Sequence, residues 1–217
     1  MLRHLLTISI RNILKHFNYS LLNIIGLAIG ISSFLFILIY VADELKYDRF
    51  HENHAQIFRM NRLYNSNDIH EDAATVSFPF GPALAEDYPD MVKNMVRFFD
   101  FQISEVLFEY RKDSTEIVKF NEEWFYLADS TVFQMFNFPL LEGDPSTVLD
   151  APNKVVLTES TAKRYFGDEP AVGKTLFFEE QVPYEVTGIM KDLPSQSHFK
   201  IDLLGSMSTF RVMRGGH

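Results

Sequence analysis

With 217 residues, a formal net charge of −9 and no cysteine, the chain excludes several classes of function. The acidic balance argues against nucleic acid as a partner, because binding it requires a basic surface. Without cysteine there is no thiol catalysis, no disulfide and no zinc site built from thiolates. The fold must therefore be held by apolar burial, for which 21 Phe and 9 Tyr offer large side chains.

Residues 1–19 are expected to form a cytoplasmic, amphipathic interfacial helix. Apolar side chains recur at intervals of three and four along most of this segment, which predicts a single apolar helical face. The cations Arg3, Arg11 and Lys15 would meet the lipid headgroups while the apolar face enters the acyl boundary. A basic leader with an incidental apolar stripe is the alternative.

Residues 20–42 carry no charged side chain and are predicted to be a transmembrane helix. At about 1.5 Å per helical residue the segment reaches roughly 34 Å, which exceeds a hydrocarbon core of about 30 Å. Basic residues precede the segment and the acidic residues Asp43 and Glu44 follow it, so we expect the N-terminus to stay in the cytoplasm. A cleaved signal peptide is the alternative, but its apolar region would be shorter and would end at a small-x-small site.

Within this span, Gly26 and Gly30 form a small-x-x-x-small pattern. Such a pattern allows another helix to approach closely inside a bilayer. Glycine is also common in membrane helices, so the two residues face either a partner helix or lipid.

Residues 43–56 are charged and amphipathic and are predicted to be a helical exit from the membrane. Residues 57–217 alternate β-rich runs with short helical segments, which predicts a mixed α/β domain and an overall α+β fold. Three closely spaced strands in it suggest an antiparallel meander. The predicted strands are 57–64, then 95–99, 105–110 and 116–120 of the meander, and 154–158, 174–178, 182–190 and 199–204; the predicted helices are 83–88, 130–136 capped by Ser130, and 159–166 ended by Gly167.

The segment 167–175 resembles a phosphate-binding loop but departs from it in three ways. Five residues separate its glycines where the motif has four, two of the five are acidic and one is proline, and the predicted order is helix, loop, strand. Phosphate binding needs the order strand, loop, helix. We therefore do not expect nucleotide binding.

Other clusters of polar residues are interpreted as solvated surface. His51 and His54 do not have the spacing of a zinc-binding helix, and the pairs Glu122–Glu123 and Glu179–Glu180 adjoin predicted turns. No strained Gly-x-Ser-x-Gly nucleophile turn occurs. The sequence therefore predicts no catalytic residue, no cofactor and no metal site.

Several segments together resemble the FtsX-like ABC transporter permeases that have a MacB-like periplasmic core domain, in particular their Bacteroidetes type. The leader, the span and the exit from the membrane carry the resemblance most clearly, and six shorter segments extend it over nearly the whole chain. The segments are Ile10–Ser20, Asn23–Gly30, Asp43–His51, Phe80–Leu84, Phe138–Pro145, Val156–Ala162, Tyr165–Gly167, Val172–Lys174 and Pro194–Phe199.

This resemblance implies a permease subunit in the bacterial inner membrane with its main domain in the periplasm. Its partners would be a separate cytoplasmic ABC ATPase, a second permease copy and membrane lipid, and Arg3, Arg11 and Lys15 could also contact the ATPase. The family's layout implies three further membrane helices after the periplasmic domain, so we expect this chain to be the N-terminal part of a longer permease or the product of a truncated gene. A single-span anchored sensor or binding domain is the alternative.

Overall fold

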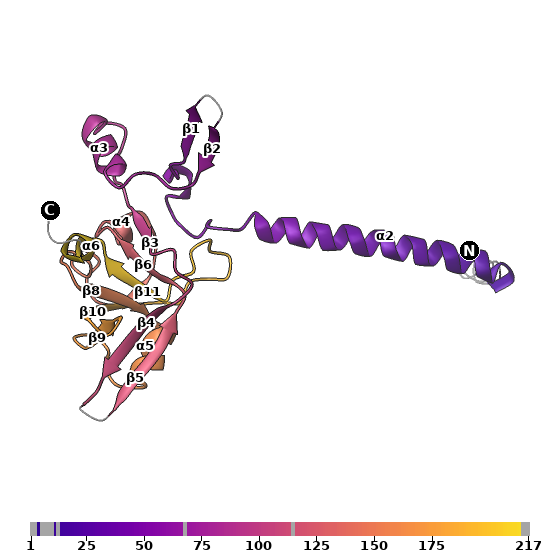
Figure 1. Ribbon diagram of the computed structural model, residues 1–217. Coiled ribbons are helices and arrows are strands. Elements are labelled where there is room, and N and C mark those ends of the chain that lie inside the picture. The colour runs from indigo at the N-terminus through magenta and orange to yellow at the C-terminus, as the bar shows by residue number, and fades with distance from the viewer. Residues whose placement is uncertain (1–3, 5–10, 12–13, 67–68, 114–115, 214–217) are drawn as a thin grey trace. The chain divides into compact units, whose positions relative to one another are not determined.

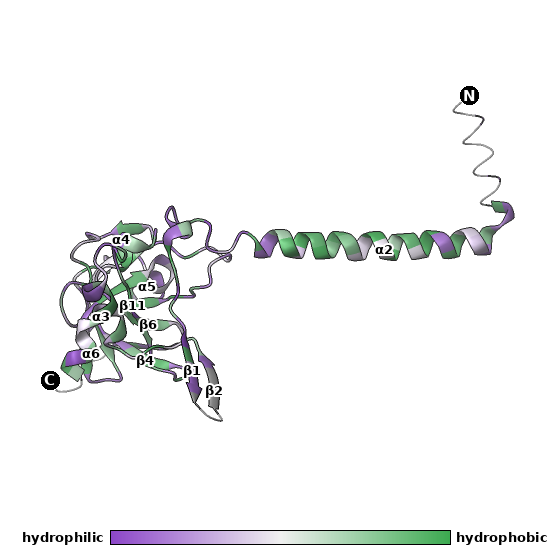
Figure 2. Ribbon diagram, turned by 90° about the horizontal axis from the view of Figure 1, so that it is seen from above, coloured by the Kyte–Doolittle hydropathy of each residue, from purple (hydrophilic) through white to green (hydrophobic). Residues whose placement is uncertain are grey.

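The computed structural model describes residues 4, 11, 14–66, 69–113 and 116–213, and the chain divides into two compact units, Met1–Tyr47 and Asp48–His217 (Figure 1). The first unit is dominated by helix α2, Phe17–Glu44, none of whose residues is buried. Hydrophobic residues cover this helix along most of its length (Figure 2). Among the described residues it is the one helix long and apolar enough to cross a membrane, and it contains the whole predicted span 20–42.

Helix α2 differs from the prediction at both of its ends. It begins at Phe17, inside the segment 1–19 assigned to the interfacial helix. Most of that segment, including Arg3, lies outside the described residues, whereas Arg11 and Lys15 are helical and exposed. At the other end, turns follow Glu44 in place of the continuous helix expected over 43–56, because Asp48 has a φ of +54°, which an α-helix cannot include.

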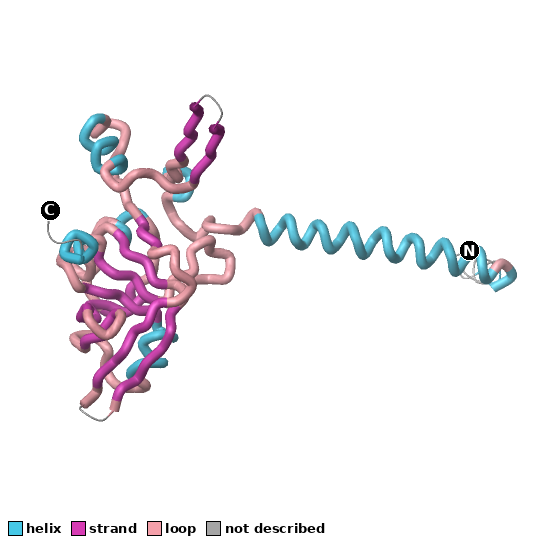
Figure 3. The backbone as a smooth tube through the Cα atoms, in the orientation of Figure 1, coloured by secondary structure: helices cyan, strands magenta, loops and turns pink. Residues whose placement is uncertain are grey.

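The second unit is built on one nine-stranded mixed sheet (Figure 3). Its neighbouring strands are antiparallel except for two parallel pairs, β6 with β11 and β8 with β10. The prediction of a mixed α/β domain after one N-terminal apolar helix is therefore confirmed. In spatial order the strands are β3 (Phe98–Asp100), β6 (Phe125–Ala128), β11 (Leu203–Ser206), β8 (Lys154–Thr158), β10 (Val182–Met190), β9 (Thr175–Phe178), β4 (Val106–Arg111) and β5 (Ile117–Glu122), with β7 (Leu140–Glu142) on the far half of β10.

The sheet curls upon itself. Strands β5 and β6 lie far apart in the spatial order, yet only Glu123 and Trp124 connect them, and two residues cannot span a flat sheet of this width. The concave face encloses the larger hydrophobic cluster, which includes the fully buried Phe108, Leu127 and Leu157. A second cluster covers the other face, and its members include Val156, Met190 and Leu204.

Helix α5, Glu159–Phe166, packs into the larger cluster and joins β8 to β9. The side chain of Thr158 accepts a hydrogen bond from the backbone N–H of Thr161 at its start, and Gly167 ends it with a φ of +63°. The predicted strand, helix and glycine cap are thus confirmed. The other short elements are the hairpin β1 (Arg62–Ser66) and β2 (Ile69–Ala73), the 3₁₀ turn η1 (His54–Gln56), and the helices α3 (Phe80–Asp87), α4 (Val132–Met135) and α6 (Ser208–Met213).

Several local predictions were wrong, among them the strands expected over 57–64 and 199–204, which the structure places at Arg62–Ser66 and Leu203–Ser206. The expected meander is reduced to the β4–β5 hairpin, because β3 pairs instead with β6, a strand that the local pattern did not reveal. The N-cap residue of α4 is Thr131 rather than Ser130, and the Thr131 hydroxyl donates to the carbonyl of Met95 at 2.8 Å rather than capping the helix.

Candidate functional site

The face of α2 that carries Gly26 and Gly30 is open in this structure. A Cβ atom added at either glycine would meet nothing within 4 Å, so no described part of the chain packs there. The two residues are four apart and therefore share one side of the helix. Without side chains at these two positions, another helix could approach the backbone closely here, and such packing stays a prediction.

Asp48, the first residue of the second unit, is hydrogen-bonded to other residues of that unit. The backbone N–H of Asp48 donates to the carbonyl of Gln196 at 3.0 Å. Its carboxylate accepts from the backbone N–H of His198 at 3.1 Å and from His198 Nδ1 at 2.7 Å. Because a carboxylate can only accept, Nδ1 of His198 carries the proton here.

A second set of contacts involves His51, three residues after Asp48. His51, predicted to be a solvated surface histidine, is 2% exposed, so that prediction was wrong. Its Nδ1 accepts a hydrogen bond from the backbone N–H of Asn137 at 3.1 Å, and the N–H of Glu52 donates to the Asn137 side chain at 2.9 Å. Burial lowers the pKa of His51 and outweighs the charge of Asp48, which acts to raise it; His54 lowers it further.

Aromatic rings surround His51. Its ring lies edge-on to Phe136, at 5.2 Å between centroids, and to Phe138, at 5.6 Å. Phe199 packs edge-on against the same two rings, at 5.4 and 6.1 Å. His51 and Phe199 thus contact one aromatic cluster although nearly 150 residues separate them in sequence.

The contacts of Asp48 and of His51 both lead to the connection between β10 and β11. We name Pro194–Phe199 the β10–β11 loop. We name Asp48–Glu52 the exit joint, and it includes their contacts to Asn137, Gln196 and His198. Of its members, the sequence analysis singled out His51 alone as a candidate for chemistry, and it rejected that role. The family resemblance includes both Asp43–His51 and Pro194–Phe199, and the structure brings these two segments together.

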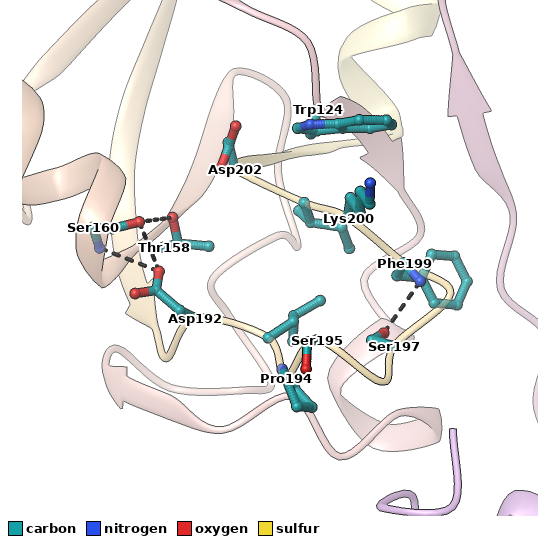
Figure 4. Close-up of a pocket in the computed structure, with 12 residues that line it drawn as sticks. Trp124, Thr158, Ser160, Asp192, Pro194, Ser195, Ser197, Phe199, Lys200 and Asp202 are labelled. Atoms are coloured by element: carbon teal, nitrogen blue, oxygen red, sulfur yellow. Dashed lines mark hydrogen bonds between the residues drawn. The ribbon is translucent and has the colours of Figure 1, made fainter. Parts of the chain in front are cut away.

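The β10–β11 loop forms one wall of a cavity of about 260 Å³ (Figure 4). Opposite it stands Trp124, whose ring lies 5.1 Å from the ammonium nitrogen of Lys200. The cavity also contains Asp192, which accepts a hydrogen bond from the Ser160 hydroxyl at 2.8 Å, and Asp202. Burial raises the pKa of Asp202, as do the charges of Asp192 and Glu123, while Arg164 opposes them.

The lining of this cavity does not assemble a catalytic set. The Ser160 hydroxyl lies beside the Asp192 carboxylate, but the described lining contains no histidine, so the cavity holds no Ser-His pair. Across the described residues no group of three or more His, Asp or Glu side chains could hold a metal ion.

Glu122 was predicted to be solvated with its neighbour Glu123, and that prediction was wrong. The Glu122 side chain is 2% exposed. It accepts hydrogen bonds from Arg164 at 2.5 Å and from the Tyr165 hydroxyl at 2.7 Å, which ties β5 to α5. Burial raises the pKa of Glu122 against the opposing effect of these two donors.

Glu109 is a second buried carboxylate, on β4, that the sequence analysis did not single out. Lys119 lies 2.8 Å from it and Arg111 also pairs with it. Hydrogen bonds from Lys119 lower the pKa of Glu109. Glu180 pairs with the same Lys119 at 2.6 Å. These ion pairs therefore link β4, β5 and the β9–β10 turn, and we assign them a structural role.

The segment 167–175 has the helix, loop, strand order predicted for it, between α5 and β9. Lys174, at the position of a phosphate-binding lysine, is paired with Glu169 of the same loop at 2.6 Å. Its charge is therefore neutralised within the loop itself.

Comparison with known proteins identifies the architecture. A family model described as the MacB-like periplasmic core domain matches residues 20–215. The chain belongs to this family. This match marks the MacB-like chain as a permease component of the MacB/FtsX type, a family that is generally not itself catalytic. The family match and the apolar helix α2 together indicate a membrane-anchored protein with an extracytoplasmic domain.

Among solved structures, a domain of a putative permease protein from Porphyromonas gingivalis shares the fold, with a TM-score of 0.53, 22% identity, and coverage of 69% of this chain and 60% of that one. The MacB-like chain thus spans about three fifths of that neighbour's length. Two further matches have lower TM-scores: the periplasmic region of MacB from Actinobacillus actinomycetemcomitans (0.38, 23% identity, 52% and 49% coverage) and the extracellular domain of the noncanonic ABC-type transporter YknZ from Gram-positive bacteria (0.37, 16%, 51% and 54%). No curated protein sequence matches the chain.

Proposed function

We propose that the chain is the N-terminal part of a permease subunit in a MacB/FtsX-type ABC transporter, where it couples ATP hydrolysis by a separate cytoplasmic subunit to movement of the periplasmic domain for export or mechanotransmission. The observation that carries this proposal is the extent of the family match. It begins at residue 20, the first residue of the predicted span, and runs to residue 215, so the apolar helix and the extracytoplasmic domain belong to one family architecture.

The charge pattern supports the proposed orientation, with the N-terminus in the cytoplasm of a bacterium and the main domain in the periplasm. Arg3, Arg11 and Lys15 precede the span, whereas every acidic residue follows it. Arg11 and Lys15 are exposed, as contact with the inner membrane surface or with the ATPase requires. The partners we propose are a cytoplasmic ABC ATPase, a second permease copy and membrane lipid.

Orientation and partner choice can be tested together. A reporter enzyme that is active only in the periplasm, fused after residue 60, should be active, because the fusion point lies beyond α2. The affinity-tagged permease, expressed from its native locus, should co-purify an ABC ATPase. Cytoplasmic reporter activity would overturn the orientation. A correctly oriented protein that brings down no ATPase would instead favour the single-span sensor.

Replacing both Gly26 and Gly30 by leucine should weaken association of two copies in the membrane by about tenfold or more. Leucine side chains would hold the helix backbones apart, and close backbone approach is what such a pattern provides. The measurement is the dimer fraction in a bilayer, by energy transfer between labelled copies.

Ala28→Leu is the matched control, since residue 28 points to the side of α2 opposite Gly26 and Gly30. It adds similar volume and should leave the dimer fraction unchanged. An unchanged dimer fraction in the double glycine variant would place both glycines against lipid.

A further inference from the structure

We propose that His51 is a proton sensor, which holds the exit joint against the rest of the second unit while its ring is neutral and releases it when the surroundings become mildly acidic. All the contacts involved lie within the second unit. Imidazole is the side chain whose charge ordinarily changes between pH 5 and 8, and histidines buried at a contact are known to act as such switches.

The hydrogen bond of His51 determines where its ring carries a proton. Nδ1 accepts from the backbone N–H of Asn137 at 3.1 Å, so Nδ1 is unprotonated and the proton of the neutral ring is on Nε2. Among the described residues Nε2 has no hydrogen-bond partner, and the side chain is 2% exposed. The site therefore accommodates the neutral ring in one of its two tautomers.

A second proton on this ring has no place in the closed structure. It would have to bind Nδ1, where it would face the N–H of Asn137, so that two donors would meet and their hydrogen bond would be lost. The charged ring would then carry two buried N–H groups without an acceptor, beside the rings of Phe136 and Phe138. Because a buried charge without partners is costly, His51 must leave the site in order to titrate.

The titratable groups around the site leave the neutral ring favoured. Asp48 and His54 come from the same stretch of chain; the charge of Asp48 raises the pKa of His51 and that of His54 lowers it, but burial lowers it most. The β10–β11 loop contributes His198, which lies 2.7 Å from the carboxylate of Asp48. Residues 136–138 contribute two phenylalanines and an asparagine, none of which titrates.

Release of His51 opens more than one contact. The backbone N–H of Glu52 donates to the side chain of Asn137 at 2.9 Å, so the two hydrogen bonds between the exit joint and Asn137 belong to adjacent residues and separate together. The same movement uncovers Phe136 and Phe138, against which the His51 ring packs. Mild acid thus exposes an aromatic surface that is covered at neutral pH.

The expected size of the effect follows from proton linkage. A histidine exposed to water has a pKa of about 6.5, and only the open form takes up the proton, so the equilibrium constant for opening should rise about thirtyfold between pH 7.5 and pH 5.0. The sign is that of a histidine whose pKa is lowered by folding: its contribution to the closed form is complete above the pKa of the free ring and is lost as the pH falls.

Hydrogen exchange of the Asn137 amide measures this opening, because exchange requires that its bond to His51 break. The full chain would be studied in detergent micelles at pH 7.5 and pH 5.0, with rates corrected for the intrinsic effect of pH on exchange. Protection of this amide should fall about thirtyfold at the lower pH. Equal protection at the two pH values would overturn the proposal.

Three matched variants assign the effect to one ring. His51→Asn removes the titrating group but keeps an acceptor near the position of Nδ1, so protection of the Asn137 amide should become independent of pH. His54→Asn and His198→Asn make the same exchange at exposed positions and should keep the pH dependence. A dependence that survives in His51→Asn, or that disappears only in His198→Asn, would contradict the assignment.

A measurement on the unaltered protein does not depend on how the variants fold. Nuclear magnetic resonance of the full chain with isotope-labelled histidine reports both the tautomer and the pKa of each ring. At pH 7.5 His51 should be neutral with its proton on Nε2, and its pKa should lie below that of a free imidazole. A proton on Nδ1, or a pKa at or above the free value, would overturn the proposal. No ATPase or second copy takes part, so failure here is distinct from failure of the proposed function.

Discussion

Replacing Phe108 by alanine should lower the free energy of unfolding of the extracytoplasmic domain by about 3–5 kcal/mol. Phe108 is fully buried on β4. Its ring contacts Phe125, Phe178 and Tyr184 at centroid distances of 4.9, 5.5 and 6.0 Å, within the larger hydrophobic cluster. The substitution leaves a cavity among large rings, and in a chain without disulfides no cross-link compensates for the lost packing.

The measurement is urea unfolding of the detergent-solubilised full chain, followed by Trp124 fluorescence while α2 stays in the micelle. Phe58→Ala is the matched control, because Phe58 is 84% exposed and its truncation should change stability by about 0.5 kcal/mol or less. Equal effects of the two substitutions would mean that the concave cluster is not the core.

Replacing Gly143 by alanine should cost about 3 kcal/mol or more. Gly143 follows β7 with a φ of +100°, and a Cβ atom there would lie 2.7 Å from the Thr187 carbonyl oxygen and 2.7 Å from Val148 Cγ1. The variant thus combines backbone strain with overpacking against β10, each worth about 1–3 kcal/mol. The same unfolding measurement tests it.

Gly173→Ala separates the two effects. Gly173 has a φ of +88°, but a Cβ atom there would meet nothing within 4 Å. This variant should therefore show the strain alone, about 1–2 kcal/mol. If Gly143→Ala costs no more than Gly173→Ala, β7 does not lie as close to β10 as the structure places it.

The stretch from β8 to β10 could be predicted from sequence because its local patterns agree with its tertiary role. Strand 154–158 and helix 159–166 were predicted with their observed bounds. Buried apolar side chains, the glycine cap and the short connections all favour the same elements there. The long apolar helix was equally evident, since length and composition alone decide whether a helix is apolar and long enough to cross a bilayer.

Pairings between distant segments could not be predicted in this way. Strand β6 is a four-residue run whose partners are β3 and the distant β11, so no nearby pattern marks it as central. His51 and Glu122 have polar neighbours in the sequence, and such neighbours predict that the two side chains are exposed to solvent. Their burial depends on partners 86 and 43 residues away, Asn137 and Tyr165. The exit joint escaped prediction for the same reason.

The position of β11 in the sheet has a consequence for the order in which the domain can fold. Strand β11 lies between β6 and β8, and among the described strands of the sheet it is the last in chain order. Until residues 203–206 emerge, the β3–β6 pair has no sheet connection to the other described strands, and the hydrogen-bonding edges of β6 and β8 that β11 joins remain unpaired. Until β11 arrives, these two open edges are exposed to pairing with other polypeptides.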